Sequence, residues 1–259
     1  MVCFGGFASA PAYLAAKRAG VPIVVHEANA LPGWANKLGA KFAAAVGVAF
    51  INTPIKGAVH VGMPLRKEIE QLTQTSNSAL ARSFFGLQDE TVTVLVTGGS
   101  LGAKRINDTI QASRRVLSAA GIQVLHIVGD RSDLPAIAEK DYVRINYCDR
   151  MDLAIAASNF AVSRAGASTV SEFAAVGLPA LFVPYPVGNG EQKLNVQEVV
   201  AAGGAVLVAD ADFTPAYVAE TLVPLISNSK QLAQMAKAAQ SVGITDGTQR
   251  LFSLVQGVL

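Results

Sequence analysis

The chain has 259 residues, of which 51% are hydrophobic and only 15% are Asp, Glu, Lys or Arg. This composition excludes a disordered chain, because disorder goes with few apolar residues and a high net charge. The formal net charge is +2, and no run of Lys or Arg is long enough to neutralise a row of phosphates. We therefore expect no nucleic-acid partner.

The high apolar content raises the question of a membrane span. The longest apolar stretch, Phe42 to Ile51, is shorter than the roughly 18 residues that a spanning helix needs. The first residues lack the basic start and cleavage pattern of a signal peptide. The two cysteines, Cys3 and Cys148, are too few for a disulfide scaffold and fit a reducing compartment. We expect a soluble α/β protein that at most touches a membrane surface.

The first part of the chain predicts a short sheet with few strands. Strands are expected at Val2–Phe4, Pro22–His26 and Val46–Ala49, and helices at Ala10–Arg18 and Pro32–Phe42. A sheet of this class usually has about 5–6 strands. The pattern therefore predicts the second half of a domain whose beginning precedes Met1. Residues 67–90, polar over Gln71–Ser78 and weakly periodic, are expected to be a connecting region.

From residue 91 on, buried strands alternate with helix-length segments. The six predicted strands are Thr91–Thr97, Gln123–Val128, Tyr142–Tyr147, Phe160–Ser163, Ala180–Pro184 and Ala205–Ala209. The first intervening helix is expected from Ala103 to about Ala119, and a last helix at Thr248–Val258 after the loop Gly243–Gly247. Six strands with helical crossovers predict a complete doubly wound, Rossmann-like domain.

Three Gly-rich turns follow predicted strands: Gly5-Gly6, Gly98–Gly102 and Arg164–Ser168. Glycine lets the backbone approach a phosphate, and the free N–H groups of the next helix attract negative charge. Tight turns also serve an ordinary strand-to-helix connection. Three of them at carboxyl ends of strands nevertheless favour a ligand that carries a pyrophosphate, although none has the dinucleotide pattern G-x-G-x-x-G.

Several polar residues beside these turns have two possible roles. Glu172 is a candidate ligand for ribose hydroxyls, but Thr169-Val-Ser-Glu172 also reads as a capping box. Gln192 has the same alternative, because Asn189-Gly-Glu-Gln192 reads as a helix start. Ser100 fits either a phosphate ligand or the start of a helix. Spacing alone leaves these alternatives open.

His26 and Glu27 end a predicted strand, where a general base or acid could stand, but a lone histidine there is more often a core residue. Asp210-Ala-Asp212 has the form of a metal-binding D-x-D motif, yet its place before Thr214-Pro215 favours a loop. No Cys/His spacing suggests zinc. We therefore expect no metal and no cofactor, and His26 is only a weak catalytic candidate.

A series of longer motifs resembles one family. In chain order the motifs are FGGFASAP, HEAN, VGMPLR, TGGSLGAKRIN, RAGASTVSE, AAVGLPALFVPYP and GNGEQKLN. Together they resemble the MurG family of UDP-N-acetylglucosamine-dependent transferases, which form lipid II in peptidoglycan synthesis. The resemblance extends from Val2 to about Gly204. It implies an α/β protein of GT-B type, with two Rossmann-like domains facing a cleft.

The resemblance also implies a domain division. Residues 1–66 would be a partial acceptor-side domain and residues 67–243 the UDP-sugar domain. Residues 244–259 would form a helix that packs back toward the first domain. The expected partners are UDP-N-acetylglucosamine, undecaprenyl-linked lipid I and the cytoplasmic face of the bacterial membrane, where binding would be peripheral. Phe42–Ile51 is a candidate membrane contact.

Site residues carry over by motif. Phosphate would lie at Gly5, Gly6, Gly98, Gly99 and Gly102, together with Ser100. The uridine and ribose would contact Cys148 and the run Ala167, Ser168, Thr169, Val170, Ser171 and Glu172, with Gln192 near the sugar. Asn29 and Arg66 would complete the donor site from the domain junction. The reaction implied is an inverting displacement at the anomeric carbon.

The chain departs from the family pattern in several places. The family usually reads HEQN, GNP and GGSQG, where this chain has Ala28, Met63 and Leu101. The family's first Gly-rich loop, which bears a histidine proposed for catalysis, would precede Met1. We therefore expect little or no transferase activity from these residues. The alternatives are an inactive fragment or a sugar-nucleotide-binding protein that keeps the donor half; a related epimerase fits HEAN and GNGEQKLN less well.

Overall fold

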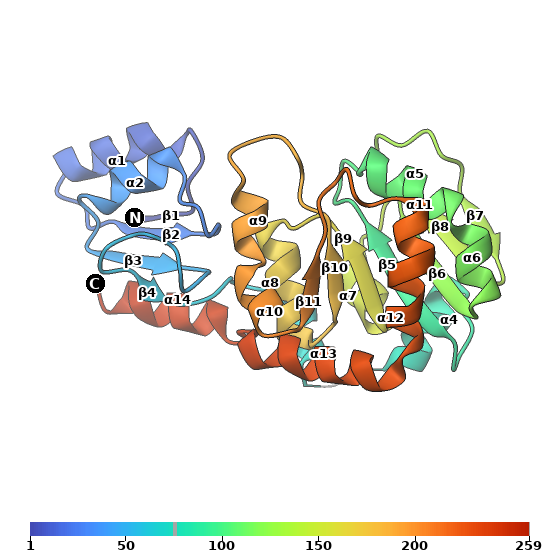
Figure 1. Cartoon of the computed structure of the whole chain (residues 1–259). Helices are drawn as coiled ribbons and strands as arrows, with labels where there is room; N and C mark the ends of the chain where they lie inside the picture. The colour runs from blue at the N-terminus through green and yellow to red at the C-terminus, as the bar shows by residue number, and fades with distance from the viewer. Residues whose placement is uncertain (75–76, 259) are drawn as a thin grey trace.

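The computed structural model describes residues 1–74 and 77–258; Thr75 and Ser76 of the polar stretch Gln71–Ser78, and Leu259, lie outside the described residues. Within these ranges the strands form two separate sheets, one of four strands and one of seven. Figure 1 shows the two sheets as neighbouring units, each with its own helices.

The N-terminal sheet is parallel throughout, with the order β1-β2-β3-β4. Its strands are β1 (Val2–Cys3), β2 (Val24–Glu27), β3 (Ala45–Val48) and β4 (Val59–His60). The helices α1 (Ser9–Arg18) and α2 (Trp34–Ala40) cover one face. The last helix, α14 (Gly247–Gln256), contacts β3 from the other side (Figure 1). Helical cover on both faces is what a parallel sheet requires.

Two expectations for this part of the chain are wrong. The described sheet has four strands rather than three, because the two-residue strand β4 pairs with β3 and is too short to show a pattern. The apolar run Phe42–Ile51 forms β3 and the turn after it. Val46, Val48 and Phe50 within it are buried. This run therefore contributes to the core, and the expectation that it contacts a membrane is not supported, because its strand is buried in the sheet.

Residues 67–90 are not a plain connecting region. They hold two short helices, α3 (Lys67–Leu72) and α4 (Ser78–Phe85). Ile69 of α3 is fully buried, and the Asn77 side chain caps α4 by accepting a hydrogen bond from the Leu80 amide at 3.0 Å. Helices of this length show too few turns for an apolar period to stand out.

The second sheet has the order β11-β10-β9-β5-β6-β8-β7. Its strands are β5 (Val92–Thr97), β6 (Ile122–Ile127), β7 (Ile137–Glu139), β8 (Tyr142–Ile145), β9 (Phe160–Ser163), β10 (Ala180–Phe182) and β11 (Ala205–Leu207). Taken without β7, this is the doubly wound Rossmann order that the sequence predicts. The strand order reverses between β5 and β9, and ligands of such sheets bind in the crevice at that point.

The helices on this sheet differ from expectation in two places. They are α5 (Lys104–Ala112), α6 (Arg114–Ala119), α7 (Met151–Ala156), α8 (Ala167–Val176), α9 (Glu191–Asn195), α10 (Gln197–Ala201), α11 (Pro215–Tyr217), the π-helical turn η1 (Val218–Leu222), α12 (Val223–Ser227) and α13 (Ser229–Val242). The single helix expected over 103–119 is broken at Ser113, whose hydroxyl donates to the Thr109 carbonyl at 2.8 Å. The crossover expected between β6 and β8 holds the antiparallel edge strand β7 instead of a helix.

Across residues 1–74 and 77–258, none of the helices is both long enough and apolar enough to cross a membrane.

Candidate functional site

A cavity of about 400 Å³ opens at the carboxyl ends of β5, β6 and β8, beside the point where the strand order reverses. Most of its lining comes from the residues after β4, the turns after β5 and β6, the loop after β8, and the first turns of α8. The lining residues are Met63–Arg66, Thr97, Gly99, Ser100, Ile127, Gly129, Asn146–Asp149, Met151, Ser168, Thr169, Glu172 and Phe173. The cavity therefore combines the segment that leaves the N-terminal sheet with the crevice of the second sheet.

The Gly-rich turn after β5 is shaped by close backbone contacts. A Cβ atom on Gly98 would lie 2.3 Å from the Ala103 amide, and one on Gly102, at φ +79°, would lie 2.2 Å from the Val128 carbonyl. Only glycine fits these positions. The turn leads into α5, whose first turn has no side-chain cap and no acidic residue. The amide groups of this first turn therefore have no side-chain cap and could bind an anion held at the Gly-rich turn.

Helix α8 also has an uncapped N-terminus, and residues of its first turns line the cavity. Its N-cap residue is Gly166, which makes no side-chain cap bond, and its first turn has no acidic residue. Thr169 lies inside the helix, so the predicted capping box over Thr169–Glu172 is wrong. Ser168, Thr169 and Glu172 line the cavity.

Glu172 is held by an arginine from the other side of the cavity. Its carboxylate is mostly buried and accepts two hydrogen bonds from the Arg66 guanidinium, Nε to Oε1 and Nη2 to Oε2, both at 3.0 Å. Burial raises the pKa of the Glu172 carboxyl, and Arg66 opposes part of that rise. A buried carboxylate with two acceptor oxygens can hold paired hydroxyl groups once Arg66 moves.

Gln192 and Asn29 lie beside the cavity and brace the turns around it. The Gln192 side-chain oxygen accepts hydrogen bonds from the Ala165 amide at 3.2 Å and the Tyr185 amide at 2.9 Å. Asn29 accepts a hydrogen bond from the Asn195 side chain at 3.3 Å. A helix, α9, begins at Glu191, so the helix start predicted within Asn189–Gln192 is confirmed. The Glu191 amide donates a hydrogen bond to the Asn189 side chain at 3.2 Å.

The structure brings together part of the predicted site. The predicted residues that line the cavity are Arg66, Gly99, Ser100, Cys148, Ser168, Thr169 and Glu172. Those that do not are Gly5, Gly6, Asn29, Gly98, Gly102, Ala167, Val170, Ser171 and Gln192. Successive residues of a helix point in different directions, so a continuous run such as 167–172 cannot all face one cavity.

The excluded residues have other roles in the fold. Ala167 and Val170 are buried in the apolar core of the second sheet. Ser171 lines a much smaller cavity at the junction with the N-terminal sheet. Gly5 and Gly6, both at positive φ, form the turn between β1 and α1, where a Cβ on Gly5 would touch Asn36. These two glycines therefore serve the other sheet.

His26 is a core residue in this structure. Its side chain is fully buried, with Nε2 at 2.9 Å from the Gly62 carbonyl and its ring beside Phe4. Burial lowers its pKa. The neighbouring Glu27 is occupied by hydrogen bonds from the amides of Asn29 and Gly33, both at 2.9 Å. Because His26 is fully buried and neither group lines the cavity at the strand ends, the structure does not support His26 as a catalytic residue.

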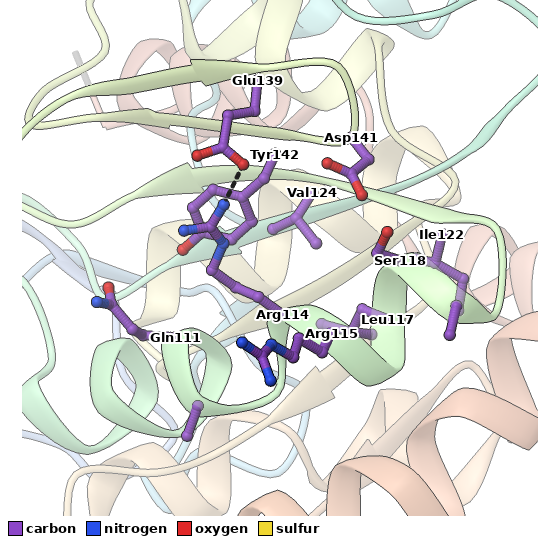
Figure 2. A pocket seen from close by; sticks show the side chains of 12 residues that line it. Gln111, Arg114, Arg115, Leu117, Ser118, Ile122, Val124, Glu139, Asp141 and Tyr142 are labelled. Atoms are coloured by element: carbon purple, nitrogen blue, oxygen red, sulfur yellow. Dashed lines mark hydrogen bonds and ion pairs between the residues drawn. The ribbon is translucent and has the colours of Figure 1, made fainter.

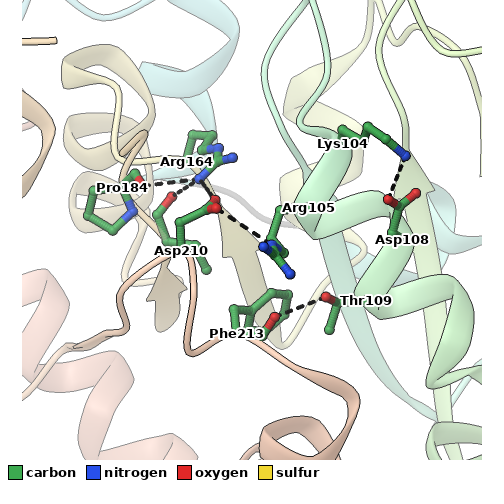
Figure 3. A network of polar contacts seen from close by, with 9 residues as sticks. Lys104, Arg105, Asp108, Thr109, Arg164, Pro184, Asp210 and Phe213 are labelled. Atoms are coloured by element: carbon green, nitrogen blue, oxygen red, sulfur yellow. Dashed lines mark hydrogen bonds and ion pairs between the residues drawn. The ribbon is translucent and has the colours of Figure 1, made fainter. Parts of the chain in front are cut away.

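The Asp210-Ala-Asp212 segment is a loop, as expected, and Asp210 pairs with arginines (Figure 3). Its carboxylate accepts a hydrogen bond from Arg164 at 2.6 Å and lies 3.6 Å from Arg105. Arg164 also donates to the carbonyls of Val183 and Pro184, both at 3.0 Å. The network fixes the strand ends beside the Gly-rich turn. Within the described part of the chain, no three His, Cys, Asp or Glu side chains are grouped to hold a metal ion.

A larger cavity of about 750 Å³ lies between α6 and the first residues of β6 and β8 (Figure 2). Arg114 crosses it, paired with Glu139 and stacked over the Tyr142 ring with its guanidinium carbon 4.1 Å from the ring centroid. No predicted site residue lines this cavity. Because seven of the predicted site residues line the smaller cavity at the carboxyl ends of the strands, we assign the functional site to that cavity.

Sequence reasoning missed several lining residues. Gly129 follows β6, and Asn146, Tyr147 and Asp149 follow β8. Their place after parallel strands is the signal that could have found them, because all such strand ends meet at one edge of the sheet. Met63–Leu65 precede Arg66 and carry no polar signal of their own.

Family models match both parts of the chain. The glycosyltransferase family 28 C-terminal domain matches residues 93–251, and the N-terminal domain of the same family matches residues 1–48. Several solved structures of low sequence identity share the fold. One is MnaA of S. aureus in complex with UDP, 15% identical, with a TM-score of 0.71 over 98% of this chain and 74% of that one.

Full-length relatives share one name. The UDP-N-acetylglucosamine--N-acetylmuramyl-(pentapeptide) pyrophosphoryl-undecaprenol N-acetylglucosamine transferase of Leifsonia xyli subsp. xyli is 53% identical over 256 residues, which are 99% of this chain and 72% of that protein. The Streptomyces coelicolor protein of the same name is 47% identical over 97% of this chain and 70% of its own length. The crystal structure of Acinetobacter baumannii MurG is 26% identical, with a TM-score of 0.78 over 99% of this chain and 72% of that one. The chain therefore belongs to glycosyltransferase family 28 and, within it, to the MurG family of N-acetylglucosamine transferases.

Proposed function

We propose that this protein transfers N-acetylglucosamine from UDP-N-acetylglucosamine to the undecaprenyl-pyrophosphoryl-linked N-acetylmuramoyl-pentapeptide acceptor, converting lipid I to lipid II. One observation carries the proposal: the chain is 53% identical, over 99% of its length, to a relative named for that reaction. The cavity at the strand ends, where seven of the predicted donor-site residues meet, supports it.

The donor would occupy the cavity between the Gly-rich turn after β5 and the first turns of α8. Ser100 and the turn Gly98–Gly102 would hold the pyrophosphate with backbone amides, aided by the uncapped start of α5. Glu172 would accept hydrogen bonds from the ribose hydroxyls, and Cys148 would lie beside the uracil. Arg66 would have to release the Glu172 carboxylate as the ribose enters. Asn29 and Gln192 would lie near the sugar.

The chemical step would be an inverting displacement. A hydroxyl of the acceptor sugar forms a bond to the anomeric carbon and passes its proton to solvent. The bond from the anomeric carbon to the pyrophosphate oxygen breaks, and UDP departs with that electron pair. Negative charge that develops on the pyrophosphate would meet the fixed N–H dipoles of the Gly98–Gly102 turn and the N-termini of α5 and α8. No residue of this chain is assigned as the base that takes the acceptor proton.

The acceptor would approach from the N-terminal sheet. We propose a division into residues 1–66, 67–243 and 244–259. The two separate sheets and the contact of α14 with β3 support this division. Because the acceptor is a lipid, we also propose peripheral contact with the cytoplasmic face of the membrane. Flotation with anionic liposomes at low salt tests it, and no co-migration would contradict it.

A second candidate function is sugar-nucleotide binding without transfer. The specific observation that favours it is the full burial of His26 near the carboxyl end of β2, which keeps this catalytic candidate in the core of the N-terminal sheet. The donor cavity does not depend on that residue.

One experiment separates the two candidates. Calorimetry with UDP and UDP-N-acetylglucosamine is combined with a radiolabelled transfer assay on a lipid I analogue, using Glu172→Ala as the control variant. Binding together with transfer supports the proposed function, and Glu172→Ala should weaken binding by about 1–3 kcal/mol. Binding without transfer supports the second candidate. Failure to bind either nucleotide would contradict both.

A further inference from the structure

Asn195 joins three segments at the junction of the two sheets. It lies at the end of α9 and is 1% exposed. Its side-chain oxygen accepts a hydrogen bond from the Ala30 amide at 2.8 Å, and its side-chain nitrogen donates to the Asn29 side-chain oxygen at 3.3 Å and the Ala165 carbonyl at 3.2 Å. The amide orientation is fixed by these partners, because a flipped amide would place donor against donor and oxygen against oxygen.

On the side of the second sheet, Asn195 and Gln192 of the same helix both bind the backbone of Ala165. Gln192 accepts from the Ala165 amide, while Asn195 donates to the Ala165 carbonyl. Both backbone polar groups of Ala165 are therefore held by α9. Ala165 directly precedes Gly166, the N-cap of α8, so α9 fixes the start of the helix that lines the donor cavity.

On the side of the first sheet, Asn195 meets a turn that is already rigid. Glu27 accepts hydrogen bonds from the Asn29 amide, the Gly33 amide and the Asn36 side chain, at 2.9, 2.9 and 2.8 Å. Asn36 is itself buried and accepts from the Tyr13 hydroxyl at 2.6 Å. The side chain of Asn195 therefore links Asn29 by hydrogen bonds to Ala165, the residue that precedes the N-cap of α8.

We propose that Asn195 is a positioning residue that places Asn29 against the sugar end of the donor site and so sets the preference for UDP-N-acetylglucosamine over UDP. This inference rests on the proposed function. Asn29 would make the contact with the sugar, and Asn195, anchored on the Ala165 carbonyl, would affect the sugar only through Asn29. Loss of the Asn195 amide would free Asn29 to move. The start of α8 would stay in place, because Gln192 still accepts a hydrogen bond from the Ala165 amide.

The test measures UDP and UDP-N-acetylglucosamine affinities of the full chain by calorimetry for Asn29→Ala, Asn195→Ala, Asn195→Asp and the double alanine variant. Asn195→Asp keeps an acceptor for the Ala30 amide but turns an oxygen toward Asn29 and Ala165. Each single variant should lose about tenfold in affinity for the UDP-sugar, the scale of one well-placed hydrogen bond, with UDP affinity unchanged. The double variant should be no weaker than either single one, because both act on the same contact.

Asn107→Ala is the matched control. Asn107 is also buried and makes two side-chain hydrogen bonds, to Val128 and His126, but both stay within the second sheet. It should lower thermal stability and keep the preference for the UDP-sugar. Equal loss of UDP and UDP-sugar affinity in the Asn195 variants, or additive effects in the double variant, would overturn the inference while leaving the proposed function standing. Failure of the unsubstituted chain to bind UDP would instead overturn the proposed function, and this inference with it.

Discussion

Arg66 and Glu172 face each other across the donor cavity and form a two-pronged ion pair, with both nitrogen-to-oxygen distances at 3.0 Å. Arg66 follows the last strand of the N-terminal sheet, and Glu172 belongs to α8 of the second. The arginine side chain is 49% exposed, whereas that of Glu172 is 11% exposed, so the arginine can swing into solvent while the carboxylate stays. In the structure, Arg66 therefore donates to the same Glu172 carboxylate that we propose as the acceptor of hydrogen bonds from the ribose hydroxyls.

Arg66→Ala should make UDP binding more sensitive to acid. Burial raises the pKa of Glu172 and Arg66 opposes that rise, so removing Arg66 should raise the pKa further. Ribose binding through two hydroxyl donors uses the ionised carboxylate, which is present above the pKa and lost as the pH falls through it. UDP affinity, measured by calorimetry from pH 8 to pH 5, should therefore decline at a higher pH in the variant.

The control for this experiment is Arg150→Ala. It removes another arginine–carboxylate pair, with Asp152 at 2.6 Å, at a residue that does not line the cavity. Its pH profile for UDP should match that of the unsubstituted protein. A profile for Arg66→Ala that also matches would show that Glu172 does not bind ribose in its ionised form.

UDP-N-acetylglucosamine binding should not require a divalent metal. The carboxylate of Asp210 in the D-x-D segment already forms ion pairs with Arg164 and Arg105. The proposed pyrophosphate site uses backbone amides at two helix N-termini instead of a metal ion. Calorimetry in the presence of EDTA should give the same affinity as in the presence of magnesium. A marked loss of affinity in EDTA would contradict this prediction and point to a metal held jointly by protein and donor.

The fold was predictable where strands are buried and long enough to show a run of β-branched residues. β5 and β9 were found nearly to the residue, because Thr91–Thr97 and Phe160–Ser163 are apolar runs bounded by turns. β4 and β7 were missed because a strand of two or three residues is too short to show an alternation of apolar and polar residues. α3 and α4 were missed for the same reason, since a helix of fewer than three turns shows too few repeats.

The site was predictable in position but not in detail. Motifs placed Ser100 and Glu172 after parallel strands, where the cavity lies. Helical periodicity could also have separated Ser168 and Thr169, which face the cavity, from Val170, which is buried in the core. Spacing could not show that Glu172 pairs with Arg66, because the two are 106 residues apart and meet only through the arrangement of two sheets.

Gly102→Ala should destabilise the protein more than Gly99→Ala. Both glycines have positive φ, +79° and +84°, so both substitutions bring similar backbone strain. A Cβ on Gly102 would also lie 2.2 Å from the Val128 carbonyl, whereas one on Gly99 meets nothing within 4 Å. Chemical denaturation should show Gly102→Ala to be less stable by about 1–3 kcal/mol, the usual cost of overpacking. Equal stability would mean that the turn can move away from β6.

Acid should destabilise the second sheet through His126, which is fully buried between Tyr142 and Asn107. Burial, reinforced by Arg144, lowers the pKa of His126 from 6.5 to about 3, so between these values the unfolded chain binds a proton that the folded protein does not. The stability from the neutral ring is complete above about pH 6.5 and is lost as the pH falls toward 3. His126→Gln should therefore flatten the decline in melting temperature between pH 7 and pH 4.5. Tyr142→Phe, which removes a partner but leaves the ring buried, should keep that decline, and an unchanged slope in His126→Gln would refute the assignment.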